Sequence, residues 1–256
     1  MATREILIAG YRHLETLGNC MGYYSCPKDA NGKRLGPLVG YAGTYEAQDG
    51  SQRQFVGDVY ANFAKAEMHP NVLKYFATCL INRFSKQIDF ASVDVLCGAP
   101  IGGYSLTDAL GLQCNIRMVK AEKKVTALKT ETSREKSELV FARHDIRWGD
   151  VCVIVEDVCN NFSTTEKFVE LIYSRGGSVL GIACFLNRSL TVDRVFEMSL
   201  STGVCVPLPV VSLVRMPIYE WKQDDPEVAD DVARDNVVWK PKDDWNRLML
   251  AMQDAG

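Results

Sequence analysis

The sequence lacks several patterns that would assign a function directly. Its nine cysteines form no Cys-x-x-Cys pair, which argues against a zinc site or a disulfide framework. Each of its three histidines stands alone, so a surface or helix-capping role is favoured over catalysis. Neither Gly-x-Gly-x-x-Gly nor Gly-x₄-Gly-Lys-Ser/Thr occurs, and their absence argues against the common dinucleotide-binding and nucleoside-triphosphate-binding loops.

Long apolar runs and a strong charge of one sign are also missing. No run is long enough to cross a bilayer, and no signal peptide is recognisable in the first nine residues. Several cysteines lie within apolar runs, as reduced core residues of a cytoplasmic protein do. A net charge of −3 and a pI near 5.7 give no reason to expect nucleic-acid or membrane binding. With 256 residues, 47% of them hydrophobic, the chain is long enough for a full α/β core.

The most informative stretch runs from Val151 to Glu166. The apolar run 151–155 predicts a strand buried on both faces, as in a parallel sheet covered by helices. Glu156 and Asp157 follow at its carboxyl end, and a helix is predicted from about residue 166, with Ser163 as N-cap and Glu166 completing a capping box. Between the acids and the helix is a polar loop whose residues are Asn160, Asn161, Phe162, Ser163, Thr164 and Thr165.

This arrangement suits a sugar phosphate. Unpaired N–H groups at a helix start attract a phosphate, and the loop hydroxyls add donors. The carboxylates of Glu156 and Asp157 accept hydrogen bonds from a diol such as the ribose 2′ and 3′ hydroxyls. An ordinary strand-to-helix turn with two solvated acids remains the alternative.

These residues resemble the phosphoribosyl pyrophosphate (PRPP) motif of type I phosphoribosyltransferases. That motif has four hydrophobics, two acids, two hydrophobics and a small Thr/Gly-rich loop, and the match covers Val153 to Thr165. The resemblance implies that Glu156 and Asp157 hold the ribose and that the loop 160–165 holds its 5′-phosphate. The family's usual Thr-Thr-Gly-Gly is Asn-Asn-Phe-Ser here, with Phe162 at a glycine position.

A second strand, turn and helix precede the PRPP motif in the sequence. An apolar strand from Val93 leads into a turn rich in glycine and proline, and a helix is predicted over 104–111. The turn resembles the pyrophosphate loop of the same family, in a Gly-x-Pro-x-x-Gly form close to that of the orotate enzymes; a tight turn needed only for packing is the alternative. Its candidate pyrophosphate-binding residues are Ala99, Pro100, Ile101, Gly102 and Gly103.

A basic segment, 117–136, overlaps the next predicted strand, 115–121, and continues beyond it. Its charges and few large apolar residues predict a mobile loop that could close over a pyrophosphate. It resembles the Arg-Lys-Glu-x-Lys-x-His-Gly loop of orotate phosphoribosyltransferases, with Lys120, Glu122 and Lys124 at the Arg, Glu and second Lys positions. Lys120, Lys124 and Asp157 are the resulting catalytic candidates. Ala121, Thr126 and Ala127 depart from the motif, and a solvated charged loop is the alternative.

The fold predicted is α/β: a central parallel sheet flanked by helices, with a small hood subdomain from the chain's two ends. Helices are expected over 4–17 and, divided at His69-Pro70, between 58 and 84; short strands or ordered loops are expected in 18–58. The strand over 204–214 should lie at a sheet edge because of Pro207 and Pro209. The domains expected are a hood segment 1–58, a core 59–215 and a helical extension 216–256.

The resemblance implies a type I phosphoribosyltransferase that uses PRPP and an orotate-like nucleobase. Mg²⁺ would be held mainly by PRPP, so no metal-binding residue is predicted, and a homodimer is implied. Two alternatives of other classes remain: a noncatalytic PRPP- or nucleotide-binding regulatory protein with the same fold, and a different α/β nucleotide enzyme.

Overall fold

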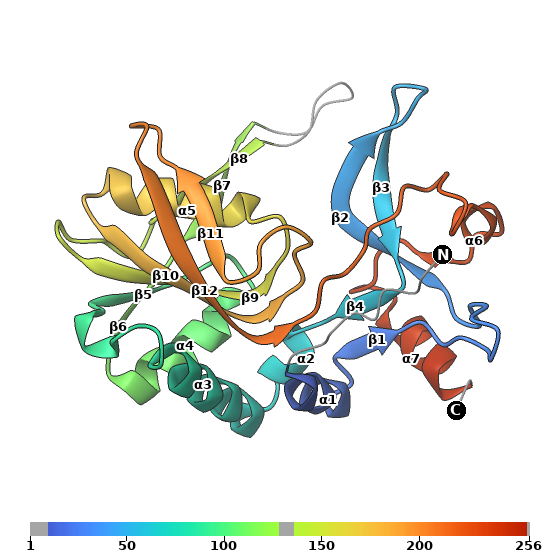
Figure 1. Cartoon of the computed structure of the whole chain (residues 1–256), viewed down its shortest axis with the longest axis horizontal. Helices are drawn as coiled ribbons and strands as arrows, with labels where there is room; N and C mark the ends of the chain where they lie inside the picture. The colour runs from blue at the N-terminus through green and yellow to red at the C-terminus, as the bar shows by residue number, and fades with distance from the viewer. Residues whose placement is uncertain (1–9, 128–135, 255–256) are drawn as a thin grey trace. The chain divides into compact units, whose positions relative to one another are not determined.

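The computed structural model describes residues 10–127 and 136–254. Its described residues form two compact units (Figure 1). The first unit comprises residues 10–13 and Glu67–Pro217, and the second comprises Leu14–Ala66 and residues 218–254. The predicted domain boundaries at residues 58 and 215 stay predictions.

The first unit is built on a six-stranded sheet. Its strand order is β11-β12-β10-β9-β5-β6, and all neighbours are parallel except the pair β11 and β12. The predicted α/β class is therefore confirmed. The sheet strands are β5 (Val95–Gly98), β6 (Arg117–Lys120), β9 (Val151–Cys159), β10 (Ser178–Asn187), β11 (Val195–Ser199) and β12 (Cys205–Arg215).

Helices cover both faces of this sheet. Helices α3 (Pro70–Phe84) and α4 (Gly103–Cys114) lie on one face, and α5 (Ser163–Ser174) lies on the other (Figure 1). Adjacent residues of β10 show the division, because Phe185 packs on Phe76 of α3 while Cys184 belongs to the core under α5. A short 3₁₀ helix, Phe90–Ser92, precedes β5. The continuous apolar runs of β9 and β10 follow from burial on both faces.

The position of β12 corrects one prediction. We expected this strand at the edge of the sheet because it contains two prolines. In the structure β11 is the edge strand, and it pairs with the half of β12 that holds Pro207 and Pro209. The remainder of β12, from Val210 on, pairs with β10. Both prolines therefore lie outside the ladder that joins β12 to the central sheet.

The basic segment after β6 also differs from its prediction. We expected one mobile loop from residue 117 to 136, but β7 (Glu122–Ala127) and β8 (Lys136–Val140) form an antiparallel hairpin. The predicted strand before it is shorter than expected, because β6 ends at Lys120. The tip of the predicted loop, residues 128–135, lies outside the described residues.

The second unit combines residues from both ends of the chain. Strand β13 pairs in parallel with β2, which pairs antiparallel with β3, and β1 pairs with β4. The unit boundaries fall within α1 and α2. The elements are α1 (Tyr11–Asn19), β1 (Tyr23–Ser25), β2 (Leu38–Glu46), β3 (Gln52–Gly57), β4 (Val59–Ala61), α2 (Ala64–Glu67), α6 (Ala229–Ala233), β13 (Val237–Val238) and α7 (Trp245–Gln253).

Two predictions for this part of the chain were partly wrong. A helix was predicted over 4–17, of which 4–9 lie outside the described residues, and α1 extends to Asn19. Strand β2 is nine residues long where only short strands were expected. Two helices do flank His69, yet β4 occupies 59–61, where helix was expected. Val59 pairs with Ser25 of β1, so a pairing distant in sequence overrides the helical spacing.

The nine cysteines are all free thiols, as predicted, and five of them are buried. Within the described residues, no helix has both the length and the apolar character needed to cross a membrane.

Candidate functional site

The two predicted loops follow neighbouring parallel strands. Strands β5 and β9 pair in register, with Gly98 opposite Val155. The carboxyl ends of parallel strands meet at one edge of a sheet, where ligands of α/β proteins bind. The loop after β5, residues 99–103, and the loop after β9, residues 160–165, therefore lie at the same edge. This juxtaposition is the basis of the candidate site.

The loop 99–103 is held against β9 through its backbone. The Ala99 N–H donates to the Val155 carbonyl (N···O 3.0 Å), and the Gly103 N–H donates to the Ala99 carbonyl (3.1 Å) as α4 begins. Ile101, which follows a cis peptide bond after Pro100, is 78% exposed. The amides of Ile101 and Gly102 have no acceptor among the described residues, so they are available to an anion.

Gly102 joins the two predicted motifs. A Cβ atom built on Gly102 would overlap the carboxylate of Asp157, and one built on Gly103 would overlap the carbonyl oxygen of Val155. The loop passes so close to β9 that a side chain at Gly102 would displace Asp157, and one at Gly103 would meet fixed backbone. The Asp157 carboxylate therefore lies directly against the candidate pyrophosphate loop.

The two acids project to opposite faces of β9, because successive side chains alternate along a strand. Asp157 is on the α4 side, next to Gly102, whereas Glu156 shares the α5 side with Ile154. Glu156 is only 8% exposed. Burial and the adjacent charge of Asp157 together raise the pKa of Glu156 to about 8, although Lys123 lowers it. Glu156 is therefore largely protonated at neutral pH.

The loop 160–165 shows how phenylalanine replaces the family's glycine. Phe162 has a φ of +60°, in the left-handed region that glycine favours. Its side chain is buried and stacks on Phe196 of β11, with ring centroids 4.8 Å apart. The bulk of Phe162 therefore points into the core under α5, away from the space above the loop amides.

The predicted helix cap is wrong in detail. Phe162 occupies the N-cap position of α5, where we expected Ser163, and no side chain caps the helix. Asn161 instead accepts hydrogen bonds from the Ser163 N–H (3.2 Å) and hydroxyl (2.9 Å), an Asx turn. The first helical bond runs from the Glu166 N–H to the Phe162 carbonyl (2.9 Å), so no capping box forms.

The remaining polar groups of this loop differ in whether a ligand can reach them. Thr165 is buried, and the exposed Ser163 already donates its hydroxyl proton to Asn161, so the partly exposed Thr164 carries the accessible hydroxyl donor. The amides of Thr164 and Thr165 have no acceptor among the described residues. Asn160 is partly exposed and has an interaction within the protein.

The two catalytic candidates from the basic segment occupy different environments. The Lys120 ammonium group pairs with Asp108 of α4 (Nζ···Oδ2 2.6 Å) and lies over the ring of Tyr104. Lys124 is exposed on β7, opposite Glu138 of β8. Lys123, which the sequence did not single out, is the lysine that lowers the pKa of Glu156. If the segment had been predicted as a strand, the alternation of its side chains would have placed Lys123 and Lys124 on opposite faces.

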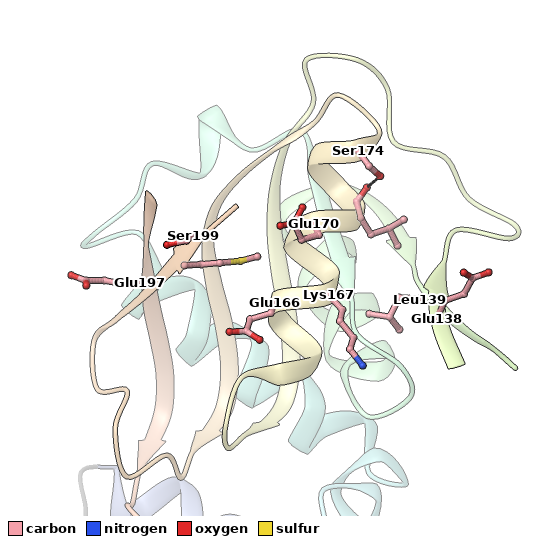
Figure 2. A pocket seen from close by; sticks show the side chains of 10 residues that line it. Glu138, Leu139, Glu166, Lys167, Glu170, Ser174, Glu197 and Ser199 are labelled. Carbon is pink, nitrogen blue, oxygen red and sulfur yellow. Dashed lines mark hydrogen bonds between the residues drawn. The ribbon is translucent and has the colours of Figure 1, made fainter. Parts of the chain in front are cut away.

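A groove in the first unit begins at Glu166, directly after the loop 160–165. It runs along the outer face of α5, has a volume of about 820 Å³ and is bordered by Glu138, Glu166, Glu170 and Glu197 (Figure 2). Glu170 is already engaged, because it accepts hydrogen bonds from the Ser201 N–H (2.7 Å) and hydroxyl (3.1 Å). Four carboxylates against the single cation Lys167 would repel a phosphorylated ligand, so this groove does not serve as the phosphate site.

The sequence comparison supports the resemblance found in the motifs. The chain is 26% identical over 168 residues to orotate phosphoribosyltransferase of Caldanaerobacter subterraneus subsp. tengcongensis, covering 66% of this chain and 75% of the relative. It is 25% identical over 130 residues to the orotate enzyme of Caldicellulosiruptor bescii, covering 51% of this chain and 61% of the relative. A hypoxanthine/guanine phosphoribosyltransferase of Methanotorris igneus is 27% identical over 127 residues, covering 47% of this chain and 66% of the relative. The predicted resemblance to phosphoribosyltransferases is thereby confirmed.

Two solved structures are similar to this chain. Orotate phosphoribosyltransferase from Aeropyrum pernix gives a TM-score of 0.44 at 16% identity, covering 67% of this chain and 84% of that structure. UMP synthase of Leishmania donovani gives 0.48 at 12% identity, covering 97% of this chain and 42% of that structure. No model of a protein family matches the chain.

Proposed function

We propose that this protein is a phosphoribosyltransferase that transfers the 5-phosphoribosyl group of PRPP to a nucleobase. The observation that carries the proposal is the contact between Gly102 and Asp157, which joins two loops with available amides at the ends of adjacent parallel strands. A ligand there would meet one anion site on each side of a carboxylate. PRPP has that order of groups, because its ribose lies between a 5′-phosphate and a pyrophosphate.

Each part of the site would perform one task in this reaction. The amides of the loop 160–165 would bind the 5′-phosphate, Asp157 and Glu156 would accept or share hydrogen bonds with the ribose hydroxyls, and the amides of the loop 99–103 would bind the pyrophosphate. A nitrogen of the base forms a bond to the anomeric carbon as the bond to pyrophosphate breaks, and the electron pair leaves with the pyrophosphate, which can take up the proton that the base nitrogen loses. Because the base is itself the nucleophile, the protein mainly positions both reactants and stabilises charge.

Mg²⁺ is the proposed cofactor. Across residues 10–127 and 136–254 no group of three or more His, Cys, Asp or Glu side chains is arranged to hold a metal ion. The donors at the site fit an ion held mainly by substrate oxygens and water, with Asp157 as the protein carboxylate within the loop region. Bound in this way, Mg²⁺ would neutralise charge on the pyrophosphate.

Orotate is the proposed base, because the orotate enzymes are among the relatives with the longest matching segments. The hypoxanthine/guanine relatives make purine bases the competing choice. A homodimer and a cytoplasmic location are proposed with the same function.

A noncatalytic PRPP- or nucleotide-binding regulatory protein is the second candidate. It is favoured by the ion pair between Lys120 and Asp108, which neutralises the lysine expected at the pyrophosphate. The departures of the hairpin from the family's loop, at Ala121 above all, favour it too. Binding is common to both candidates, and turnover separates them.

The first test is calorimetric titration of PRPP with Mg²⁺ into the protein, followed by an assay of pyrophosphate release with orotate, hypoxanthine, guanine and adenine. Release with one base establishes the enzyme and names its substrate. Binding without release on any of the four establishes the regulatory protein. Absence of PRPP binding would overturn both candidates.

The site assignment has its own test. Asp157→Asn should weaken PRPP binding by at least about 100-fold, because it removes the carboxylate that lies against Gly102 of the loop 99–103. Glu197→Gln is the matched control, since it removes one carboxylate from the groove along α5, and it should leave the affinity unchanged. An unaltered affinity in Asp157→Asn would place the PRPP site elsewhere.

A further inference from the structure

Strand β11 forms one edge of the six-stranded sheet, and among the described residues only β12 pairs with it. Two hydrogen bonds fix the phase of that pairing: the Val210 N–H donates to the Arg194 carbonyl (N···O 2.8 Å), and the Leu200 N–H donates to the Val204 carbonyl (2.8 Å). In an antiparallel pair, residues bonded to the partner alternate with residues whose N–H and C=O point the other way. The outward-pointing residues of β11 are therefore Val195, Glu197 and Ser199.

Two observations agree with this phase and show what the edge lacks. Both prolines of β12, which have no N–H to donate, lie opposite outward-pointing residues of β11. Ser201, two residues beyond the strand in the same outward row, donates its N–H to the carboxylate of Glu170 on α5 (2.7 Å). Within the described part of the chain, the outward backbone groups of β11 have no such partner. This edge is therefore a short row of open donors and acceptors, which is a template for another strand.

The groove along α5 adjoins this edge and combines apolar and acidic residues. Leu171 and Met198 supply apolar lining, and Met198 itself is buried. Glu197 lies on the face of the sheet away from α5, as Figure 2 shows, because its side chain alternates with that of Met198. Glu166 is exposed at the start of α5, on the opposite face. Exposed carboxylates therefore flank the open edge on both faces of the sheet.

We propose that β11 is a docking edge for an extended, basic segment of a partner protein, which adds to the sheet as a further strand. The backbone of that segment pairs with the outward row of β11. Its lysine or arginine side chains lie beside Glu197 on one face and reach Glu166 on the other, and a lysine stem on the α5 side covers Leu171. This inference does not rest on the proposed function, because it concerns a different surface.

Charge selects this occupant over others. A second copy of the chain, paired antiparallel through β11 about Glu197, would bring two Glu197 carboxylates directly opposite each other, and like charges in that position destabilise a strand pair. Glu138 and Glu166 add to an acidic rim that repels nucleic acids, anionic membranes and acidic peptides. Arg194, which precedes β11, already pairs with Asp193 (Nε···Oδ2 3.9 Å). A basic strand is attracted by the same rim.

The probe for this edge is a fluorescent, end-blocked peptide of sequence Lys-Val-Lys-Thr-Lys-Val-Lys, measured by fluorescence anisotropy at low salt. Wild type should bind it with a dissociation constant on the order of 0.1 mM. A second peptide of equal charge carries N-methyl groups on two adjacent central residues, so that one methyl meets β11 in either register. It should bind at least about tenfold more weakly. Equal affinities for the two peptides, or no binding of the first below about 1 mM, would overturn the inference.

Variants of the protein test the same contact from the other side. Ser199→Pro removes one outward N–H without changing the charge, and proline is tolerated at an edge when its nitrogen faces outward. It should weaken binding of the first peptide about fivefold, whereas Ser199→Ala, which keeps the N–H, should stay within about twofold of wild type. Glu197→Gln should weaken binding about threefold at low salt, and this difference should vanish near about 0.5 M salt.

Three results would decide against the proposal. Equal affinities of folded Ser199→Pro and Ser199→Ala would show that the outward N–H is not used. A loss in Glu197→Gln that is unchanged by salt would contradict charge as the basis of selection. Sedimentation of wild type without peptide tests the second copy, because a dimer that Ser199→Pro dissociates would make another copy of this chain the occupant. If Ser199→Pro does not fold by circular dichroism, the methylated peptide still decides the matter in wild type.

Discussion

The two sides of the carboxyl end of β9 are built in contrasting ways. On one side, Asp157 faces a loop whose close approach depends on the missing side chains of Gly102 and Gly103. On the other side, Glu156 lies within a core to which the loop 160–165 is anchored by the large side chain of Phe162. A loop can therefore expose its backbone amides to a ligand in two ways: it can lack side chains, or it can bury a large one in the core.

Removing the aromatic anchor should have the largest effect. Phe162→Ala removes the stack with Phe196 and leaves a cavity under α5, and it should lower the free energy of unfolding by about 4 kcal/mol. Phe162→Gly loses the same contacts but relieves the left-handed backbone, so it should be about 1 kcal/mol more stable than Phe162→Ala. Urea unfolding of the three proteins measures both differences. If glycine is no better than alanine, the left-handed conformation is not what restricts this position.

The buried acid on the same side should make stability depend on pH. The pKa of Glu156 is raised to about 8 in the folded protein, so its contribution is fully present below its unfolded value and is lost as pH rises toward 8. Relative to Glu156→Gln, wild type should lose about 3 kcal/mol of unfolding free energy between about pH 5 and about pH 8. If the unfolding free energies of wild type and Glu156→Gln change with pH in the same way across this range, Glu156 is ionised in the folded state.

On the glycine side, Gly103→Ala should lower the unfolding free energy by about 2 kcal/mol, because the new methyl group meets the fixed carbonyl of Val155. Gly18→Ala is the control, since no atom lies within 4 Å of a Cβ there. Denaturant unfolding measures both. A Gly103→Ala protein as stable as wild type would mean that α4 can move away from β9 at little cost.

The smallest effect on stability is expected at the neighbouring glycine. Gly102→Ala meets the end of the Asp157 side chain, which can rotate, so the unfolding free energy should change by less than about 0.5 kcal/mol. The displaced carboxylate should weaken PRPP binding by about 30-fold, or about 2 kcal/mol. Calorimetry and unfolding on the same sample separate the two quantities. A stability loss as large as that of Gly103→Ala would contradict the distinction between a movable and a fixed neighbour.

The sequence predicted well those parts of the fold in which a local pattern and burial agree. The strand β9 and the helix α5 were predicted because two-sided burial and amphipathic packing leave direct traces in the sequence. A parallel sheet was expected from the alternation of strands with helices, and the pairing of β5 with β9 within it brings the two predicted loops to one edge.

The sequence failed where partners distant in the chain decide the structure. The charged strand β7 has little apolar periodicity, because its stability comes from pairing with β8. The order of β11 and β12 depends on which strand covers the prolines. Phe162 could not be assigned to the core without Phe196, and Lys120 could not be assigned to Asp108 without the position of α4. These contacts explain why the predicted residues alone do not define the candidate site.

The second unit is built from two stretches of the chain that are far apart in sequence, so it cannot be completed until residues 218–254 have been synthesised. Arg34 and Asp231 pair across 197 residues of sequence, and Leu38 and Val56 share a core with Val228 and Val237. While a ribosome makes the chain, β2 and β3 emerge long before β13 exists to cover them, whereas the sheet of the first unit is complete by residue 215. The nascent β2–β3 hairpin therefore exposes apolar residues until β13 has been synthesised. We expect chaperones to bind this region during that time.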